Sequence, residues 1–325
     1  MSSAAENLST IATDRYDRND TLRPSRRTML LAGAGVLAAA GLAYRRRRPA
    51  PREVERTLPL QVHHDGAGVR LQRALGGPAL RDLDPFLLLD GFHSVDPADY
   101  VAGFPTHPHR GFETVTLLFD GTMTHADSVG NAGTLRSGDV QWMTAGRGIL
   151  HSEFPGGDAA GLLSGFQLWV NLPGRNKMMA PRYQDIGAAD VPVVDLGDGR
   201  ARVLAGTIGR TMGPVEGIVT EPTVLDVTLS PGATFDHTIA GGHTAFVQPH
   251  TGSLLVGDRP TRVRAGELAV LGPGERVSIR GEGRFLLIAA APIGEPIARR
   301  GPFVMNTEAE LEQAFADHRA GRIGG

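Results

Sequence analysis

Two short stretches of this sequence place chemically active side chains two residues apart. His107 and His109 form one pair, and His151 and Glu153 form another, 151 − 107 = 44 positions further on. In an extended strand, side chains two positions apart point to the same face, so each pair should project together. Three imidazoles and one carboxylate that converge on a point are suited to a divalent metal such as iron, manganese or zinc. The sequence therefore predicts a metal site.

A second carboxylate competes for the fourth ligand position. Glu113 follows His109 by four residues, so strand alternation would put both side chains on one face. The residues alone leave both Glu113 and Glu153 open as ligands. His125 and Asp127 also share a face and could line a pocket, but no motif supports them. A solvated hairpin is the simpler interpretation of these two residues.

Other aromatic and imidazole side chains favour structural roles. Trp142 and Trp169 could stack on an aromatic substrate, yet both lie in strand-like apolar runs, which indicates core packing. His237, His243 and His250 are spread over separate segments without a His-x-His pair. We therefore expect the second half of the chain to hold no metal.

Short strands and turns must position the metal ligands. The chain has 325 residues with 43 Gly, 22 Pro and a hydrophobic content of 41%. Many short apolar runs separated by Gly and Pro turns favour an all-β architecture. We expect a metal-binding barrel over residues 53–184 and a second, metal-free barrel over residues 185–296.

Two segments fall outside this strand pattern. Residues 176–192 lack clear periodicity, which indicates a linker or short helix between the halves. Residues 297–325 should form a helical tail, because Thr307 and Glu310 have the spacing of a capping box. Gly321 is a natural stop for that helix.

Composition and charge exclude several classes of function. The absence of cysteine rules out disulfides, thiolate ligands and cysteine nucleophiles. Residues 1–48 carry a balance of +5; because the whole chain carries −2, the remainder carries −7. An acidic body gives no electrostatic reason to expect nucleic-acid binding. Lys177 is the one lysine among many arginines, which we attribute to genome composition rather than function.

Residues 1–52 have the pattern of a targeting leader. Residues 1–24 are polar and aperiodic, which is typical of disorder. Arg26 and Arg27 precede an apolar run over residues 29–44, and a run of arginines follows it. As a helix this apolar run spans about 24 Å, short of the ~30 Å bilayer core. The pattern resembles a twin-arginine export signal. It predicts export or membrane attachment, and a cytoplasmic location is the alternative.

Several longer runs match the signatures of a known family. They are HPHRGFETVT (107–116), GDVQWMTAGRGILHSE (138–153), QLWVNLP (167–173) and GPFVMNT (301–307). These runs resemble the pirins, which are two-domain members of the cupin superfamily. The resemblance covers nearly everything after the leader. It implies two tandem cupin β-barrels of the jelly-roll type, with a C-terminal helix docked on the first barrel.

The resemblance also implies a ligand set. His107, His109, His151 and Glu153 would together bind one iron, which leaves Glu113 beside the site, orienting a ligand imidazole. Fe(II) is the implied metal, and Mn, Ni, Co, Cu and Zn are alternatives.

The function implied by the resemblance is a dioxygenase of the quercetin 2,3-dioxygenase type, which opens a flavonol ring with dioxygen. Glu153 would act as the base, with Glu113 in reserve. One alternative is an iron-binding regulator whose metal redox state controls a protein partner, and another is a closed zinc site that only stabilises the barrel. We expect a monomer with no nucleic-acid partner and with membrane contact only through the leader.

Overall fold

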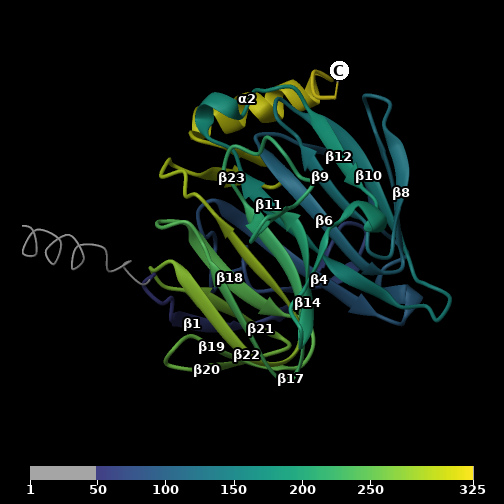
Figure 1. Ribbon diagram of the computed structural model, residues 1–325. Coiled ribbons are helices and arrows are strands. Elements are labelled where there is room, and N and C mark those ends of the chain that lie inside the picture. The colour runs from purple at the N-terminus through teal and green to yellow at the C-terminus, as the bar shows by residue number, and fades with distance from the viewer. Residues whose placement is uncertain (1–48, 325) are drawn as a thin grey trace, which may run out of the picture. The chain divides into compact units, whose positions relative to one another are not determined.

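The computed structural model describes residues 49–324. The predicted twin-arginine pair and the apolar run over residues 29–44 lie outside the described residues, so the leader stays a prediction. From residue 49 to residue 324, no helix is both long enough and apolar enough to span a membrane. This part of the chain consists mostly of β-strands, and its one α-helix is α2 (Glu308–Arg319), near the C-terminus (Figure 1).

The first barrel consists of two antiparallel sheets. Its strands are β2 (Gln61–Asp65), β3 (Val69–Arg73), β4 (Phe86–Ser94), β5 (Phe104–His109), β6 (Phe112–Asp120), β7 (Thr122–Asp127), β8 (Ala132–Arg136), β9 (Val140–Thr144), β10 (Ile149–Gly156), β11 (Leu163–Asn171) and β12 (Arg182–Ile186). One sheet has the order β12-β9-β6-β11-β4-β3-β2, and the other has the order β5-β10-β7-β8. Apolar side chains from both sheets meet inside this barrel, among them Leu118 and Met123.

The second barrel is built from one large antiparallel sheet. Its strands are β1 (Val54–Pro59), β13 (Val193–Asp195), β14 (Gly199–Ala205), β17 (Thr223–Thr238), β18 (Thr244–Pro249), β19 (Ser253–Val256), β20 (Thr261–Arg264), β21 (Glu267–Leu271) and β22 (Arg276–Ala290). The long strand β22 pairs with β17, β18 and β19, which lets the sheet curl around its own core. The small elements are β15 (Thr207–Ile208), β16 (Thr211–Met212), η1 (Pro97–Asp99), η2 (Gly174–Asn176) and η3 (Ala188–Asp190). The expected all-β fold with two tandem barrels is confirmed.

Two strands lie elsewhere than the sequence pattern suggested. β1 falls in the segment assigned to the first barrel, but it pairs with β21 of the second, with Leu58 opposite Leu268. β12 falls in the segment predicted as a linker or short helix, yet it pairs with β9, so that prediction is wrong over residues 182–186. β12 is an edge strand and only partly buried, so its sequence lacks the alternation of a covered strand.

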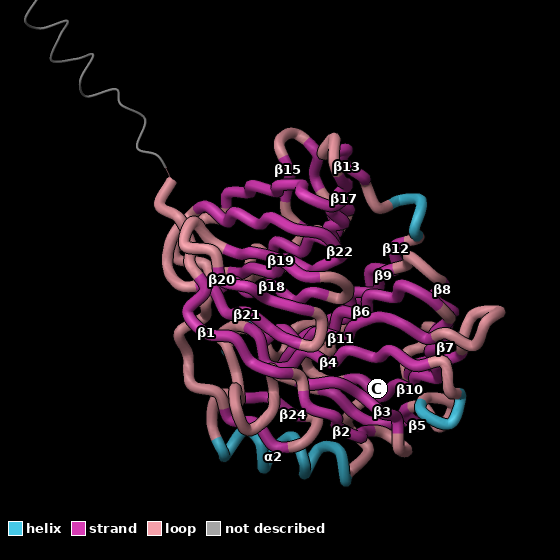
Figure 2. Tube along the Cα trace, turned by 90° about the horizontal axis from the view of Figure 1, so that it is seen from below, coloured by secondary structure: helices cyan, strands magenta, loops and turns pink. Residues whose placement is uncertain are grey.

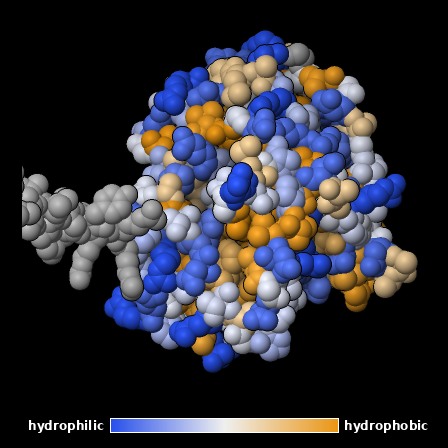
Figure 3. Space-filling view, viewed as in Figure 1, coloured by the Kyte–Doolittle hydropathy of each residue, from blue (hydrophilic) through white to orange (hydrophobic). Residues whose placement is uncertain are grey.

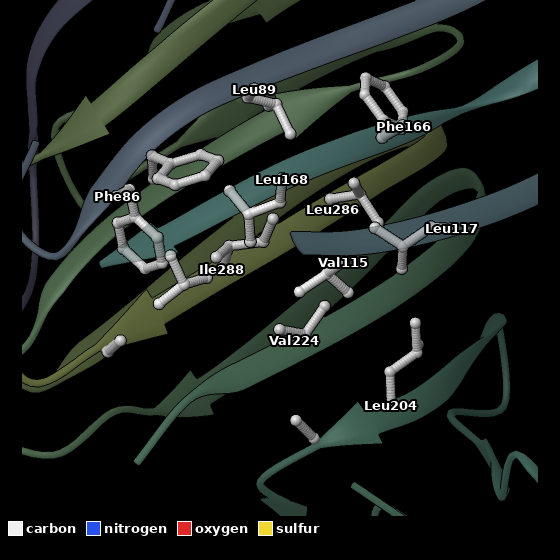
Figure 4. Close-up of a cluster of buried hydrophobic side chains, with 14 of the residues drawn as sticks. Phe86, Leu89, Val115, Leu117, Phe166, Leu168, Leu204, Val224, Leu286 and Ile288 are labelled. Carbon is white, nitrogen blue, oxygen red and sulfur yellow. The ribbon is translucent and has the colours of Figure 1, made fainter. Parts of the chain in front are cut away.

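An apolar core lies between the two barrels. Val115 and Leu117 of β6 pack there against Leu286 and Ile288 of β22 (Figure 4). The residues of β22 that alternate with these, Phe285 and Leu287, point the other way, into the second barrel. Because each strand thus serves two cores, it has apolar residues on both faces. The face of the molecule in Figure 3 is largely hydrophilic, with hydrophobic residues gathered near its centre.

The C-terminal tail returns to the first barrel. A two-stranded ribbon of β23 (Ala298–Arg300) and β24 (Phe303–Met305) leads into α2, the long cyan helix in Figure 2. Thr307 and Glu310 form the predicted capping box, and the helix ends just before Gly321. The Arg110 guanidinium, next to the metal-site strand, donates to the Asp317 carboxylate of α2 at 2.7 Å. The tail therefore supports the corner of the chain that follows His109.

Candidate metal centre

The first histidine pair lies on β5, at the edge of the four-stranded sheet. Pro108 separates the two histidines, and a residue without a backbone N–H is tolerated at a sheet edge. The two side chains share one face, as strand alternation predicts. Their Nε2 atoms lie 3.1 Å apart, and the ring centroids are separated by 4.7 Å. His107 and His109 thus present their nitrogens to one point.

Strand pairing brings the third histidine to the same point. β10 runs antiparallel to β5, and His151 lies directly opposite His107. The ring of His151 is 4.4 Å from that of His107 and 4.9 Å from that of His109, measured between centroids. The potential ligand atoms of the three residues all lie within 4.8 Å of one another. Within residues 49–324, this is the one group of three or more potential metal-ligating side chains that converges in this way.

The chemistry of these three side chains fits a metal ion. Both ring nitrogens of His151 are buried without a hydrogen-bond partner. Buried polar atoms without partners are costly, so they point to a bound group. Burial lowers the pKa of His109 well below its usual range and that of His151 to about 4. Both imidazoles are therefore neutral near pH 7, the form that binds metal.

The fourth predicted ligand lies next to this cluster. Glu153 shares the inward face of β10 with His151 and is almost fully buried. Both of its carboxylate oxygens accept from Nε2 of Gln167, at 3.0 and 3.1 Å. Its oxygens are not part of the converging histidine group, so its role as a ligand stays a prediction.

Gln167 is a functional candidate that the sequence analysis missed. Its amide oxygen accepts from Nε1 of Trp169 at 3.3 Å, while its Nε2 donates to Glu153. Gln167 and Trp169 stand two apart on β11, so the alternation that identified the histidine pairs would have found this pair as well. The hydrogen bonds that connect Trp169, Gln167 and Glu153 in series fix the orientation of the Glu153 carboxylate.

Glu113 does not share a face with the metal-site histidines, so that prediction is wrong. β5 ends at His109, and the chain turns at Gly111, whose φ of +88° breaks the strand. Glu113 lies near the start of β6, which belongs to the other sheet. Its carboxylate accepts a hydrogen bond from Thr144 Oγ1 at 2.7 Å. Strand alternation places it on the face of Val115, in the core between the barrels. Its predicted contact with a ligand imidazole is not present.

His125 is buried, which corrects the expectation of a solvated hairpin for this residue. It lies on β7 directly opposite Glu153, and one ring nitrogen lies 3.0 Å from Nε2 of Gln141. Asp127 lies opposite His151 but is only partly buried, and it accepts from Asn131. The interior of the first barrel is therefore polar well beyond the metal cluster.

Lys177 is a positioning residue rather than a feature of genome composition alone. The side chain is buried, and Nζ donates to the carbonyls of Gly111 and Val304 and to Oδ1 of Asn171 at 2.6–3.0 Å. Burial lowers the pKa of Lys177 to about 7. The side chain ties together the corner after His109, the end of β11 and the C-terminal tail.

A cavity of about 670 Å³ opens beside the cluster. His107, His109 and Glu153 lie in its wall, so the metal position would face it. Trp142 packs in the core as predicted, but Trp169 both packs on Phe112 and lines the cavity, which corrects the expectation of a purely structural role. The other lining residues are Asp65, Gly66, Arg73, Gly76, Arg81, Leu88, Asp90, Phe104, Pro105, Gln167, Arg299, Gly301 and Pro302.

Two β-barrels in tandem, with a histidine cluster inside the first, define a bicupin. Residues 68–170 match the Pirin family, and residues 224–324 match the Pirin C-terminal cupin domain. Human pirin is 40% identical over 269 residues, which cover 80% of this chain and 90% of the human protein. The chain therefore belongs to the pirin family.

Two other similar proteins have names that state an enzymatic activity. A Pseudomonas aeruginosa protein with the provisional name quercetin 2,3-dioxygenase is 46% identical over 265 residues, or 79% of this chain and 93% of that protein. The crystal structure of quercetin 2,3-dioxygenase from Acinetobacter baumannii superposes with a TM-score of 0.77 at 35% identity. The match covers 85% of this chain and 99% of that one.

Proposed function

We propose that this pirin is an Fe(II)-dependent dioxygenase that opens a flavonol ring with dioxygen. The observation that carries the proposal is the convergence of His107, His109 and His151 at the wall of a cavity with aromatic sides. The names of the Pseudomonas and Acinetobacter relatives support the same activity. A bound iron would supply Lewis-acid and redox chemistry toward dioxygen at this site.

The protein's own residues would bind the flavonol and accept its proton. Trp169 and Phe104 line the cavity, so their rings can contact the planar substrate. Glu153 faces the same cavity and is held by Gln167, so its carboxylate can accept the proton of the substrate's 3-hydroxyl group. His151 is buried behind this wall, which keeps water from that side of the site.

The test is anaerobic loading of the full chain with Fe(II), followed by quercetin and air. Loss of flavonol absorbance and release of carbon monoxide are measured together. We expect metal-dependent ring opening that Glu153→Gln slows by about 100-fold or more, because a positioned general base contributes roughly 10²–10⁴-fold. Glu55→Gln, at an exposed position on β1, is the matched control and should keep full activity.

Two outcomes would contradict the proposal. Bound iron without any flavonol turnover would point instead to a regulatory protein that responds to the redox state of its metal. Tight zinc binding, with no access of small ligands to the metal, would point to a structural site.

A further inference from the structure

The cavity beside the histidine cluster has a distinctive distribution of charge. Three arginines line it, and one of them is compensated: Arg73 forms a bidentate pair with the Asp90 carboxylate, at 2.5 and 2.6 Å, and also contacts Asp65 at 3.2 Å. Outside the metal site, the wall therefore holds three arginines against Asp65 and Asp90, which leaves a balance of +1. Both aspartates pair with Arg73, and neither forms an ion pair with Arg81 or Arg299.

Arg299 is held in place but lacks a carboxylate partner among the described residues. Its Nη1 donates to the carbonyl oxygen of Leu87 at 2.8 Å, and its guanidinium lies over the Trp169 ring at 4.9 Å from the centroid. This arrangement fixes a planar cation on the same aromatic wall that would contact a substrate. The side chain is half-buried, so its charge is screened less than that of a surface arginine.

Arg81 extends this positive wall to the surface. It is solvent-exposed, lines the same cavity, and forms no hydrogen bond or ion pair with any residue from 49 to 324 through its side chain. Beyond residue 48 the chain has a charge balance of −7, so a cavity wall in which three arginines face two aspartates stands out against its surroundings. An anion would be attracted to this mouth and repelled by most of the remaining surface.

We propose that the preferred substrate is a planar hydroxylated aromatic that carries a carboxylate, with Arg299 and Arg81 binding this acidic group. The aromatic body would lie against Trp169 and Phe104, and the hydroxyl end would face the histidine cluster. Guanidinium binds carboxylate in a planar, bidentate geometry that suits an aromatic acid. Only the orientation of the hydroxyl group toward the histidine cluster rests on the proposed function. Binding of the acidic group by the arginines does not require the metal.

The cavity volume agrees with a ligand of this size. About 670 Å³ lies within the usual range for small-molecule pockets, roughly 300–1,000 Å³. Its apolar lining residues include Leu88, Pro105 and Pro302, and its polar lining residues include the metal-site side chains and the arginines. A ligand with an apolar body, a hydroxyl group and an acidic group matches this composition.

The test compares two probes that differ by one group: 3-hydroxyflavone and its 4′-carboxylate. Flavonol fluorescence gives the Kd of each probe for the full chain, without metal and with Fe(II) under anaerobic conditions. We expect the carboxylate to bind about 10-fold tighter or more in both states, since charge-assisted bonds contribute more than neutral ones. Rising salt should reduce this preference, because it screens the partly exposed charges.

Variants assign the preference to the two arginines. The double variant Arg81→Gln/Arg299→Gln should bind both probes equally, while Arg299→Lys should keep much of the preference because it retains the charge. Arg280→Gln, at an exposed position in the second barrel, is the matched control and should keep the full preference. If the double variant fails to fold, Arg81→Gln alone, on the surface, should still reduce the preference severalfold.

Equal affinity of the wild type for the two probes, or a preference that survives in the double variant, would overturn the proposal. The readout is separate from turnover. If the protein opens no flavonol ring but prefers the carboxylate probe, only the proposed function is contradicted. If it turns over quercetin without this preference, only the proposed substrate class is contradicted.

Discussion

The two barrels share a fold but fill their interiors differently. Inside the second barrel, strands contribute a continuous apolar cluster that includes Phe235, Leu254, Phe285 and Leu287. Inside the first barrel, one end is apolar, while the other holds the half-buried Gln167 and buried polar side chains, which are His109, His125, Gln141, His151 and Glu153. The same barrel fold thus accommodates an apolar or a polar interior, and the polar interior of the first barrel contains the candidate metal site.

The histidines of the second barrel sharpen this comparison. His237 stacks on Phe235, and His250 lies 3.0 Å from the hydroxyl of Ser164 at the contact with the first barrel. His243 lies with His237 along a separate cavity of about 490 Å³. They sit on different segments and are not part of a converging ligand group. That the second barrel binds no metal stays a prediction, and substitution can test it.

The largest expected effect is loss of the metal. His107→Ala and His151→Ala should each reduce the bound metal from about one ion per chain to almost none, because two imidazoles hold a divalent ion poorly. His237→Ala, in the second barrel, should leave the stoichiometry unchanged. Elemental analysis of the purified proteins, with circular dichroism as a check on folding, measures this. Unchanged metal content in all three variants would place the site elsewhere.

The histidine pairs could be predicted from the sequence because each pair lies within one strand. Alternation is a local rule, and β5 and β10 are continuous through His107–His109 and His151–Glu153. The same rule failed for Glu113, because the turn at Gly111 moves the chain into another sheet. A glycine just after a candidate strand often marks a turn, so Gly111 already indicated in the sequence that the strand could end there.

Contacts between segments far apart in the chain could not be predicted by local rules. Lys177 binds carbonyls of residues 111 and 304, and Arg299 reaches the cavity from the C-terminal ribbon. The pairing of β1 with the second barrel is of the same kind. Family resemblance predicted the barrels correctly, but which side chains meet at the site depends on these long-range contacts.

A second prediction concerns the apolar barrel. Phe285→Ala should reduce the free energy of unfolding by about 3–5 kcal/mol, because it opens a cavity in a fully packed core. Metal content should stay at the wild-type value in the folded protein, since the histidine cluster lies in the other barrel. Denaturant unfolding with elemental analysis measures both. Phe154→Ala, at an exposed position of the first barrel, is the control and should change stability little. Loss of metal from folded Phe285→Ala protein would mean that the two interiors are coupled.

The smallest expected effect arises between the barrels, at Glu113. Burial raises the pKa of this carboxyl from its usual value of 4.5 to about 7. The folded state therefore holds a proton that the unfolded state releases between these two values, so stability from this group is full below pH 4.5 and is lost as pH rises through 7. Glu113→Gln removes the charge while keeping an oxygen that can accept from Thr144.

The variant should match the wild type near pH 4.5 and be more stable at pH 8 by up to about 3 kcal/mol, since each pKa unit corresponds to about 1.4 kcal/mol. Denaturant unfolding of the metal-free proteins across this range measures the difference, with Glu55→Gln as the exposed control. Flavonol turnover should be unaffected, because Glu113 faces the core between the barrels and not the cavity. Loss of turnover in a stable Glu113→Gln protein would restore this residue to the catalytic site.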